Sequence, residues 1–413
     1  MHEQQVAAIH LGRDTLPVPL RPDASLCLLD TTEWFGETSG GIRTYLLEKG
    51  QYVNAHPALR HVLVVPGACD AIHDSEGVRT YRLKGAKIPG QAPYRFMLSG
   101  RKVGRVLHHE RPDLIEVGSP FIVPWLVQRA NRRIDAPIIA YYHSNLPRLF
   151  SSRGNGAGTK TVGNALEAAA WRYMRALHRP LALTVASSMY SVRELERAGI
   201  ERVVHVPLGV DLELFHPSRR ERSAAVRKRL GIPSGKVAGF IGRFAAEKEL
   251  PMLLDAWSAV EKVTAARLVL VGAGPLETRL RAHAYASRVT FLPFTNDRTD
   301  VADLLAALDL YVAPGRVETF GLSSLEALAS GTPLLAAHAG GVAEQVERSG
   351  AGRVFEAGSS ASLSEQAIAL LAEDASALGT RGRAYAEAEH SWSTVFDRLF
   401  DVYAGVVANH AMR

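Results

Sequence analysis

Short apolar runs alternate with longer amphipathic segments along most of this 413-residue chain, and this alternation constrains the fold more than any other feature. In the first half the strand-like runs are SLCLLD, HVLVVP, LIEVGSP, APIIAYYH and LALTVASS. The alternation begins again with KVAGFIGR and continues through ARLVLVGAG, RVTFLPF, LDLYVAP, TPLLAA and AGRVFEAG. Buried strands separated by helical patterns are typical of parallel α/β sheets. The sequence therefore predicts two doubly wound α/β domains.

The two domains are expected to join within VPLGVDLELFHPSRR, where prolines and a glycine interrupt the pattern. We predict a first domain over residues 1–207 and a second over residues 208–391. The last segment, about 392–413, has aromatic and aliphatic residues at helical spacing. We expect this helix to pack back on the first domain.

The charge of the chain is unevenly distributed. Residues 1–215 carry 26 Lys and Arg against 20 Asp and Glu, whereas the remainder is neutral. A basic half favours an anionic partner, and this modest excess suits an acidic small molecule or a lipid surface better than a nucleic acid. No run approaches the roughly 18–20 apolar residues of a bilayer-spanning helix, and the N-terminus lacks a signal-peptide core. These features predict a cytoplasmic protein that can contact the inner face of the membrane peripherally.

The first motif with chemical potential is GRFAAEKEL, which follows the strand-like run VAGFI. Its Gly242, Arg243 and Lys248 are expected at the carboxyl end of a strand and on the turn into a helix, where doubly wound sheets bind ligands. An arginine fork, a lysine and a helix N-terminus together can hold a pyrophosphate. The alternative is a solvated turn with a lysine on the helix surface.

The second motif is ETFGLSSLEALASGTP, in which Glu318 and Glu326 stand eight residues apart after another strand-like run. The residues between them open a helix, so its first backbone N–H groups would lie near an anion. Glu326 falls in a largely apolar helix, where a carboxylate is costly without a partner, and it could accept hydrogen bonds from sugar hydroxyls. Alternatively, Glu318 caps the helix and Glu326 faces solvent.

Together, GxRxxxxK, the E-x7-E pair within ETFGLxxLEALAxGTP, and the Gly340-Gly341 turn resemble the retaining glycosyltransferases of family 4. The resemblance covers essentially the whole chain and is strongest over residues 236–350. The combined spacing is far more specific than any single motif. It implies the GT-B fold, in which two Rossmann-like domains face each other across a cleft.

The resemblance also implies roles for individual residues. Arg243 and Lys248 would neutralise the donor diphosphate, including the charge that develops as the glycosidic bond breaks. Glu326 would hold the ribose hydroxyls, and Glu318 would hold the donor sugar. The backbone amides that would assist Glu318 belong to Phe320, Gly321 and Leu322.

In the first domain, TSGGIRTYL places Gly40 and Gly41 where the family's glycine loop approaches the diphosphate. His143, in IIAYYHSNLP, resembles the family's histidine near the donor sugar, although a histidine at a strand end is often structural. The nucleotide base would lie near Phe294 and its neighbours, and Phe294 could equally pack at its strand end. Ser144 and Asn145 follow His143 where many relatives have Thr and Asp, which leaves the transferred sugar open.

Other signals exclude cofactors. In LVLVGAGPLE, Glu277 occupies the third glycine position of a dinucleotide fingerprint, so nicotinamide binding is not supported. The chain has no D-x-D pair, no HExxH and no Cys-x-x-Cys. We therefore expect a mechanism without a metal or a cofactor, in which cationic side chains replace the metal.

Residues 84–112 form a basic stretch interleaved with apolar residues. Such a stretch can lie on anionic lipid, or it can be a solvated helix with an apolar inner face. Its candidate acceptor-side or membrane-side residues are Lys84, Lys87, Arg95, Arg101, Lys102 and Arg105.

These observations predict a retaining hexosyltransferase that uses a UDP- or GDP-linked sugar and acts on a membrane lipid such as diacylglycerol or phosphatidylinositol. A soluble sugar or small metabolite is the alternative acceptor. A UDP-sugar epimerase of the same fold and a non-enzymatic nucleotide-sugar binder are the alternative functions. A GT-B phosphorylase would need a pyridoxal-binding lysine and is generally a longer chain.

Overall fold

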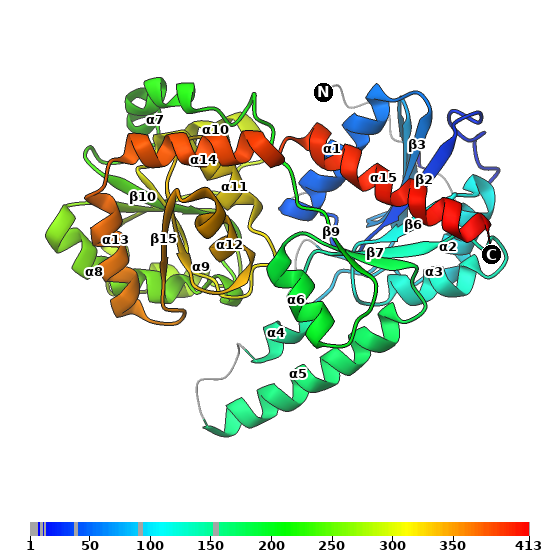
Figure 1. Cartoon of the computed structure of the whole chain (residues 1–413), viewed down its shortest axis with the longest axis horizontal. Helices are drawn as coiled ribbons and strands as arrows, with labels where there is room; N and C mark the ends of the chain where they lie inside the picture. The colour runs from blue at the N-terminus through cyan, green and yellow to red at the C-terminus, as the bar shows by residue number, and fades with distance from the viewer. Residues whose placement is uncertain are drawn as a thin grey trace.

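The chain folds into two α/β domains, each built on one sheet (Figure 1). The computed structural model describes residues 7–8, 11, 14–36, 40–89, 94–151 and 157–412. The first sheet has the strand order β1-β4-β5-β3-β2-β6-β7-β8-β9 and the second β12-β11-β10-β13-β14-β15. The strands are β1 (Ala7–Ala8), β2 (Leu26–Thr31), β3 (Leu59–Gly67), β4 (Ala71–Ser75), β5 (Val78–Lys84), β6 (Leu114–Val117), β7 (Ile138–Tyr142), β8 (Leu183–Ala186), β9 (Val203–His205), β10 (Val237–Ile241), β11 (Arg267–Val271), β12 (Val289–Leu292), β13 (Leu310–Ala313), β14 (Leu334–Ala337) and β15 (Gly352–Phe355).

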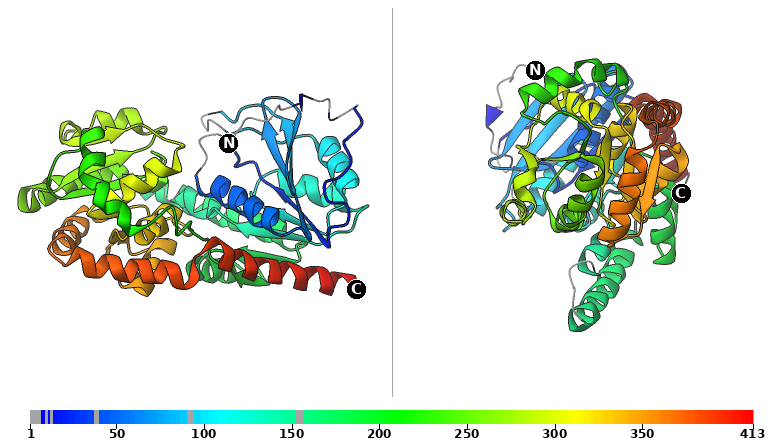
Figure 2. Two further views of the ribbon diagram at one scale, coloured as in Figure 1. Left: turned by 90° about the horizontal axis from the view of Figure 1, so that it is seen from above. Right: turned by 90° about the vertical axis from the view of Figure 1, so that its left-hand side faces the viewer.

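Helices connect the strands and cover both faces of each sheet (Figures 1 and 2). The described α-helices are α1 (Gly41–Ala55), α2 (Gly100–Glu110), α3 (Val123–Asn131), α4 (Leu146–Ser151), α5 (Ala157–His178), α6 (Met189–Arg197), α7 (Ser223–Arg229), α8 (Leu250–Thr264), α9 (Glu277–Arg281), α10 (Arg298–Ala307), α11 (Leu322–Ala329), α12 (Gly340–Ser349), α13 (Ser360–Leu371), α14 (Ala375–Glu389) and α15 (Trp392–Ala411). Three short 3-10 turns are η1 (Pro217–Arg222), η2 (Ala246–Lys248) and η3 (Ala286–Arg288). None of the helices in these described segments is long and apolar enough to cross a membrane.

The second sheet is parallel throughout, and strands β2, β3 and β5 to β9 of the first sheet are also parallel. Their central strands are buried on both faces, as expected when helices cover both sides of a parallel sheet. The prediction of two doubly wound domains is confirmed. The sequence did not reveal the hairpin of β4 and β5, which adds an antiparallel edge next to β3.

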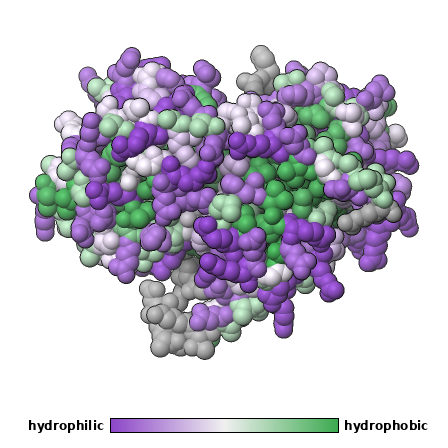
Figure 3. Space-filling view, in the orientation of Figure 1, coloured by the Kyte–Doolittle hydropathy of each residue, from purple (hydrophilic) through white to green (hydrophobic). Residues whose placement is uncertain are grey.

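The C-terminal helix α15 lies on the first domain and contacts α1. Its Tyr403 reaches a fully buried cluster in which Lys49 contacts both Asp30 and Glu116 at 3.0–3.1 Å. The Tyr403 hydroxyl donates to Glu116 and accepts from the Lys49 ammonium, while His61 contacts Asp30 at 2.6 Å. Figure 3 shows hydrophobic side chains gathered on the first domain around this helix, whereas much of the second domain is hydrophilic on the same face.

Candidate active site

Two helix N-termini, one from each domain, meet in the space between the domains. Helix α1 begins at Gly41, and a Cβ atom placed on Gly41 would lie 3.7 Å from the side chain of Leu322, the first residue of α11. A Cβ atom placed on Gly40 would have no described atom within 4 Å, so the space beside this glycine is open. Because helix N-termini carry unpaired N–H groups and a partial positive charge, their convergence forms an anion-binding position.

The loop before α11 is held by α12. Gly321 has a φ of +87°, and a Cβ there would lie 2.3 Å from Val342, so only glycine fits this turn. The buried Gln345 amide donates to the carbonyl oxygens of Phe320 at 2.8 Å and Gly321 at 3.4 Å. A trans peptide carries its carbonyl and its N–H on opposite sides, so these bonds turn the N–H groups of Gly321 and Leu322 away from α12.

The predicted cationic residues lie at the end of β10. The Lys248 ammonium forms an ion pair with the Glu318 carboxylate, which unites the two motifs that the sequence singled out. Burial and the neighbouring Arg243 lower the pKa of Lys248. The Arg243 guanidinium lies 5.6 Å from the ring centre of Tyr94, a residue of the first domain. These contacts bring Arg243, Lys248 and Glu318 to one place and make Arg243 span the two domains.

Tyr94 belongs to an aromatic group that the sequence did not identify. Its ring meets Trp34 edge to face at 4.6 Å, and Trp34 meets Phe121 in the same way at 5.1 Å. Tyr94 lies in a loop, Trp34 follows β2 and Phe121 precedes α3, so no sequence pattern connects them. The group forms an apolar wall beside Arg243.

The glycines of LVLVGAGPLE have a packing role. A Cβ on Gly272 would lie 2.0 Å from the carbonyl oxygen of Gly242, and one on Gly274 would lie 2.5 Å from that of Phe244. Any side chain would therefore displace the 242–244 turn that carries Arg243. The glycines after β11 therefore allow this turn to pack closely. This packing role explains why glycines occur there, and no dinucleotide-binding role is needed.

Glu326 is buried on α11 and has a charged partner, so it does not face solvent. The Arg298 guanidinium donates to one Glu326 oxygen at 2.6 Å and covers the Phe215 ring at 4.8 Å. Burial raises the pKa of Glu326, and Arg298 opposes that shift. Glu48 on α1 lies near Arg298 and Glu326. Burial and the charge of Asp211 raise the pKa of Glu48 to about 7. The sequence did not single out Arg298 or Glu48, because each approaches Glu326 from a segment that is distant from it in the sequence.

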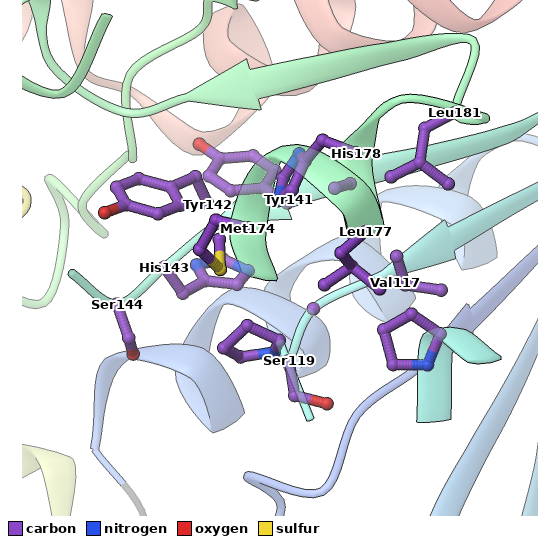
Figure 4. A pocket seen from close by; sticks show the side chains of 14 residues that line it. Val117, Ser119, Tyr141, Tyr142, His143, Ser144, Met174, Leu177, His178 and Leu181 are labelled. Atoms are coloured by element: carbon purple, nitrogen blue, oxygen red, sulfur yellow. The ribbon is translucent and has the colours of Figure 1, made fainter. Parts of the chain in front are cut away.

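His143 directly follows β7 and lies at the contact between the domains. The Thr319 hydroxyl donates to the His143 carbonyl oxygen at 2.9 Å, and the imidazole stacks on Tyr141 at 4.3 Å. Burial and the charge of Lys49 lower the pKa of His143 to about 3, so its imidazole is neutral at physiological pH. The ring borders a cavity of about 20 Å³, room for one water, beside Met174 (Figure 4).

Ser144 and Asn145 stand where many relatives have Thr and Asp, and the structure shows what Asn145 does there. The Asn145 side-chain oxygen accepts a hydrogen bond from the Arg148 backbone N–H at 3.2 Å at the start of α4. An aspartate could make the same capping bond, because both residues are good helix N-caps. Asparagine therefore keeps the local fold and removes one negative charge next to His143.

The basic stretch of residues 84–112 is not one amphipathic surface. Lys84 ends β5, Lys87 and Arg95 pair in an isolated bridge, and among the described residues of this stretch only Gly100–Glu110 is helical. The apolar side chains of α2, including Val103, pack in the core, so they are not available for lipid. Three of the six cations have internal partners: Lys102 pairs with Asp70, Arg105 donates to the carbonyl oxygens of Leu11 and Asp14, and Arg95 donates to that of Gly85. The other three, Lys84, Lys87 and Arg101, are exposed.

Phe294 follows β12 at the same edge of the second sheet and is 36% exposed. Part of its ring is therefore accessible. Its contact with a nucleotide base stays a prediction.

Comparison with known families decides the identity of the chain. The model for "Glycosyl transferases group 1" matches residues 235–373, and that for "Glycosyltransferase Family 4" matches residues 39–214. The chain belongs to the family-4 glycosyltransferases. The resemblance seen in the sequence is thus confirmed, and the two matched segments correspond to the two domains that form the site.

This family-4 glycosyltransferase has characterised relatives. It is 33% identical to the GDP-mannose-dependent α-(1-6)-phosphatidylinositol dimannoside mannosyltransferase of Mycobacterium tuberculosis over 77% of this chain and 81% of the relative. It is 30% identical to a GDP-mannose-dependent α-mannosyltransferase of the same species over 83% of this chain and 85% of the relative.

Solved structures share the fold. Sucrose-phosphate synthase from Thermosynechococcus elongatus superposes with a TM-score of 0.75 at 19% identity, covering 92% of this chain and 99% of that chain. Anabaena HepE in complex with UDP-glucose gives a TM-score of 0.70 at 20% identity, covering 92% of this chain and 100% of that chain. The GT-B fold predicted for this glycosyltransferase is confirmed.

Proposed function

We propose that this glycosyltransferase moves a hexose from a nucleotide-diphosphate sugar to a hydroxyl group of a membrane lipid, with retention of anomeric configuration and without a metal. The observation that carries the proposal is the meeting of the α1 and α11 N-termini at Gly41 and Leu322. Lys248 and Arg243 reach the same end of the second sheet. Polarised amides and two cations at one position are what a diphosphate requires.

The reaction would break the bond between the anomeric carbon and the leaving phosphate oxygen, and form a bond from that carbon to the acceptor oxygen. The acceptor proton would pass to the departing phosphate oxygen on the same face of the sugar, so no protein base is required. Lys248 and Arg243 would stabilise the charge that develops on the phosphate. A neutral His143 would hydrogen-bond a sugar hydroxyl or the acceptor, because its lowered pKa leaves it uncharged.

GDP-mannose is the first candidate donor, since both mycobacterial relatives named above depend on it. A UDP-linked hexose is the second candidate, because the Anabaena structure of the same fold holds UDP-glucose. A phosphatidylinositol-type lipid is the first candidate acceptor, on the evidence of the phosphatidylinositol dimannoside mannosyltransferase and of the basic first half of the chain. Diacylglycerol is a further lipid acceptor to test.

The test is a turnover assay with EDTA in which GDP-mannose, UDP-glucose and ADP-glucose are each offered with phosphatidylinositol vesicles, diacylglycerol vesicles or soluble sugars. Proton NMR of the product reports the anomeric configuration. We expect an α-linked glycolipid from an α-linked donor, and a loss of about 100-fold in kcat in Lys248→Met. A β-linked product, or a requirement for metal, contradicts the mechanism. Transfer to a soluble sugar alone contradicts the lipid acceptor, and epimerised donor without transfer indicates an epimerase.

A further inference from the structure

Helix α5 presents an uncharged stripe to solvent. Val162 is 59% exposed and Leu166 is 48% exposed, and because they are four residues apart on a helix, their side chains are neighbours at the surface. They share one face of the helix with three further residues, because spacings of three, four and seven residues lie on one side of a helix. The α5 stripe consists of Val162, Ala165, Leu166, Ala169 and Tyr173.

The side of α5 that adjoins the stripe is apolar as well, and this side is already used. Ala170, Met174 and Leu177 are buried, and α5 packs against α4. A helix that is apolar over about half of its circumference is normally buried over all of that arc. Figures 1 and 2 show α5 extending away from the body of the first domain, so the described parts of the chain cover only its inner side.

The stripe leads to an exposed tryptophan at its C-terminal end. Trp125 on α3 is 42% exposed, and its indole N–H donates to the Tyr173 hydroxyl at 3.0 Å. That hydroxyl in turn donates to the Phe121 carbonyl oxygen at 2.7 Å. Tryptophan and tyrosine with an apolar ring and a satisfied polar tip are enriched where protein meets the lipid–water interface.

The charges beside the stripe are positive. Arg172 is exposed next to the stripe on α5, and Arg129 is exposed one turn after Trp125 on α3. The only acidic residue of α5 in the sequence is Glu167, which lies off the stripe and pairs with Arg148 at 3.4 Å. An uncharged stripe flanked by arginines matches an anionic lipid surface in both polarity and charge.

We propose that the α5 stripe and Trp125 dock this glycosyltransferase on the anionic surface of a lipid bilayer. The inference rests on the proposed lipid acceptor and names the surface that brings the enzyme to it. Helix α4, against which α5 packs, begins three residues after His143. Docking through α5 therefore brings the His143 side of the cleft next to the membrane. This role falls to α5 rather than to α2, whose apolar side is buried.

The experiment is co-sedimentation of the full chain with phosphatidylcholine vesicles, with and without about 30% phosphatidylinositol. The wild type is expected to bind the anionic vesicles and to dissociate as salt is raised. The double variant Val162→Glu/Leu166→Glu is expected to lose about tenfold in bound fraction, since carboxylates oppose both the apolar and the electrostatic contact. Val263→Glu is the matched control, because Val263 is 67% exposed on α8 of the second domain, and it should bind like the wild type.

Equal binding of the double variant and the wild type overturns the proposal, and so does a wild type that does not bind vesicles. A wild-type dimer that the double variant converts to a monomer, with unchanged vesicle binding, shows that a second copy occupies the stripe and also overturns it. Titration of GDP in solution distinguishes failure of the docking proposal from failure of the proposed function. If the double variant loses vesicle binding but still binds GDP, the substitutions affect docking alone. If the wild type binds vesicles but no nucleotide, the donor proposal is refuted and the docking proposal is not.

Discussion

Replacing Gln345 by glutamate tests whether the loop that would hold the donor sugar depends on α12 for its shape. The Gln345 amide makes the two bonds to the Phe320 and Gly321 carbonyl oxygens. Glutamate has nearly the same size but, when ionised, offers no donor, so both bonds are lost and a negative charge faces two carbonyl oxygens. Gly321, at a positive φ, gives the backbone the freedom to turn.

The magnitude follows from two separate costs. Leaving a buried carbonyl without a partner costs about 1–3 kcal/mol of folding stability. If the peptide turns, at least one oriented backbone N–H leaves the sugar position, and removing one such donor from a reacting centre costs about 10²–10³-fold in rate. We therefore expect kcat to fall about 100-fold, while affinity for GDP alone, which lacks the sugar, changes by less than about tenfold.

The assay measures kcat and KM for the sugar nucleotide, Kd for GDP, and the midpoint of thermal unfolding. Gln366→Glu on α13 is the matched control, since the Gln366 side-chain oxygen accepts from Arg353 at 3.3 Å and glutamate keeps that bond. The reasoning is refuted if Gln345→Glu turns over at the wild-type rate. It is also refuted if GDP binding falls as steeply as kcat, because the effect would then not be specific to the sugar.

Three further predictions concern stability and donor binding. Because the pKa of Glu48 is raised from 4.5 to about 7, the folded protein retains a proton that the unfolded chain releases, so stability falls as pH rises between these values. Glu48→Gln removes this loss, and its Tm should exceed that of the wild type at pH about 8 by more than at pH about 5; an equal difference at both contradicts the assignment. Tyr403→Phe leaves Lys49 and Glu116 with one partner fewer and should cost about 1–3 kcal/mol in urea unfolding, where an unchanged midpoint would contradict the role of the buried cluster. Gly41→Ala should keep the wild-type Tm, since its Cβ meets Leu322 at an ordinary 3.7 Å, yet lower GDP affinity about tenfold by titration calorimetry; wild-type affinity would mean that the diphosphate does not approach this glycine.

The fold and the main loops of the second domain could be predicted because they depend on local pattern. The apolar runs fix the parallel strands, and the residues after each run necessarily lie at one edge of the sheet. Glu318 and Lys248 were placed at that edge on this basis, and the structure pairs them. The antiparallel pair β4 and β5 had no such signature, since these two strands lie near an edge of the sheet and mix polar residues with apolar ones instead of forming a continuous apolar run.

Contacts between segments distant in sequence could not be predicted. Arg298 pairs with Glu326, Gln345 supports the loop before α11, and Tyr94 meets Arg243 only after the chain has folded. Lys49 was not suspected of being buried, because lysine is almost always exposed unless it is paired. Helical periodicity likewise shows that α2 has an apolar side but not whether that side meets lipid or the core.

The most direct test of the account is titration of GDP and of guanosine into the wild type and Lys248→Met, with EDTA present throughout. We attribute binding largely to the diphosphate, through two helix N-termini and the cations beside them. GDP is expected to bind the wild type at least about 100-fold more tightly than guanosine does, and Lys248→Met is expected to remove most of this difference. Equal affinities for GDP and guanosine, or a preference for GDP that appears only with added metal, would contradict a cation-built diphosphate site in this cleft.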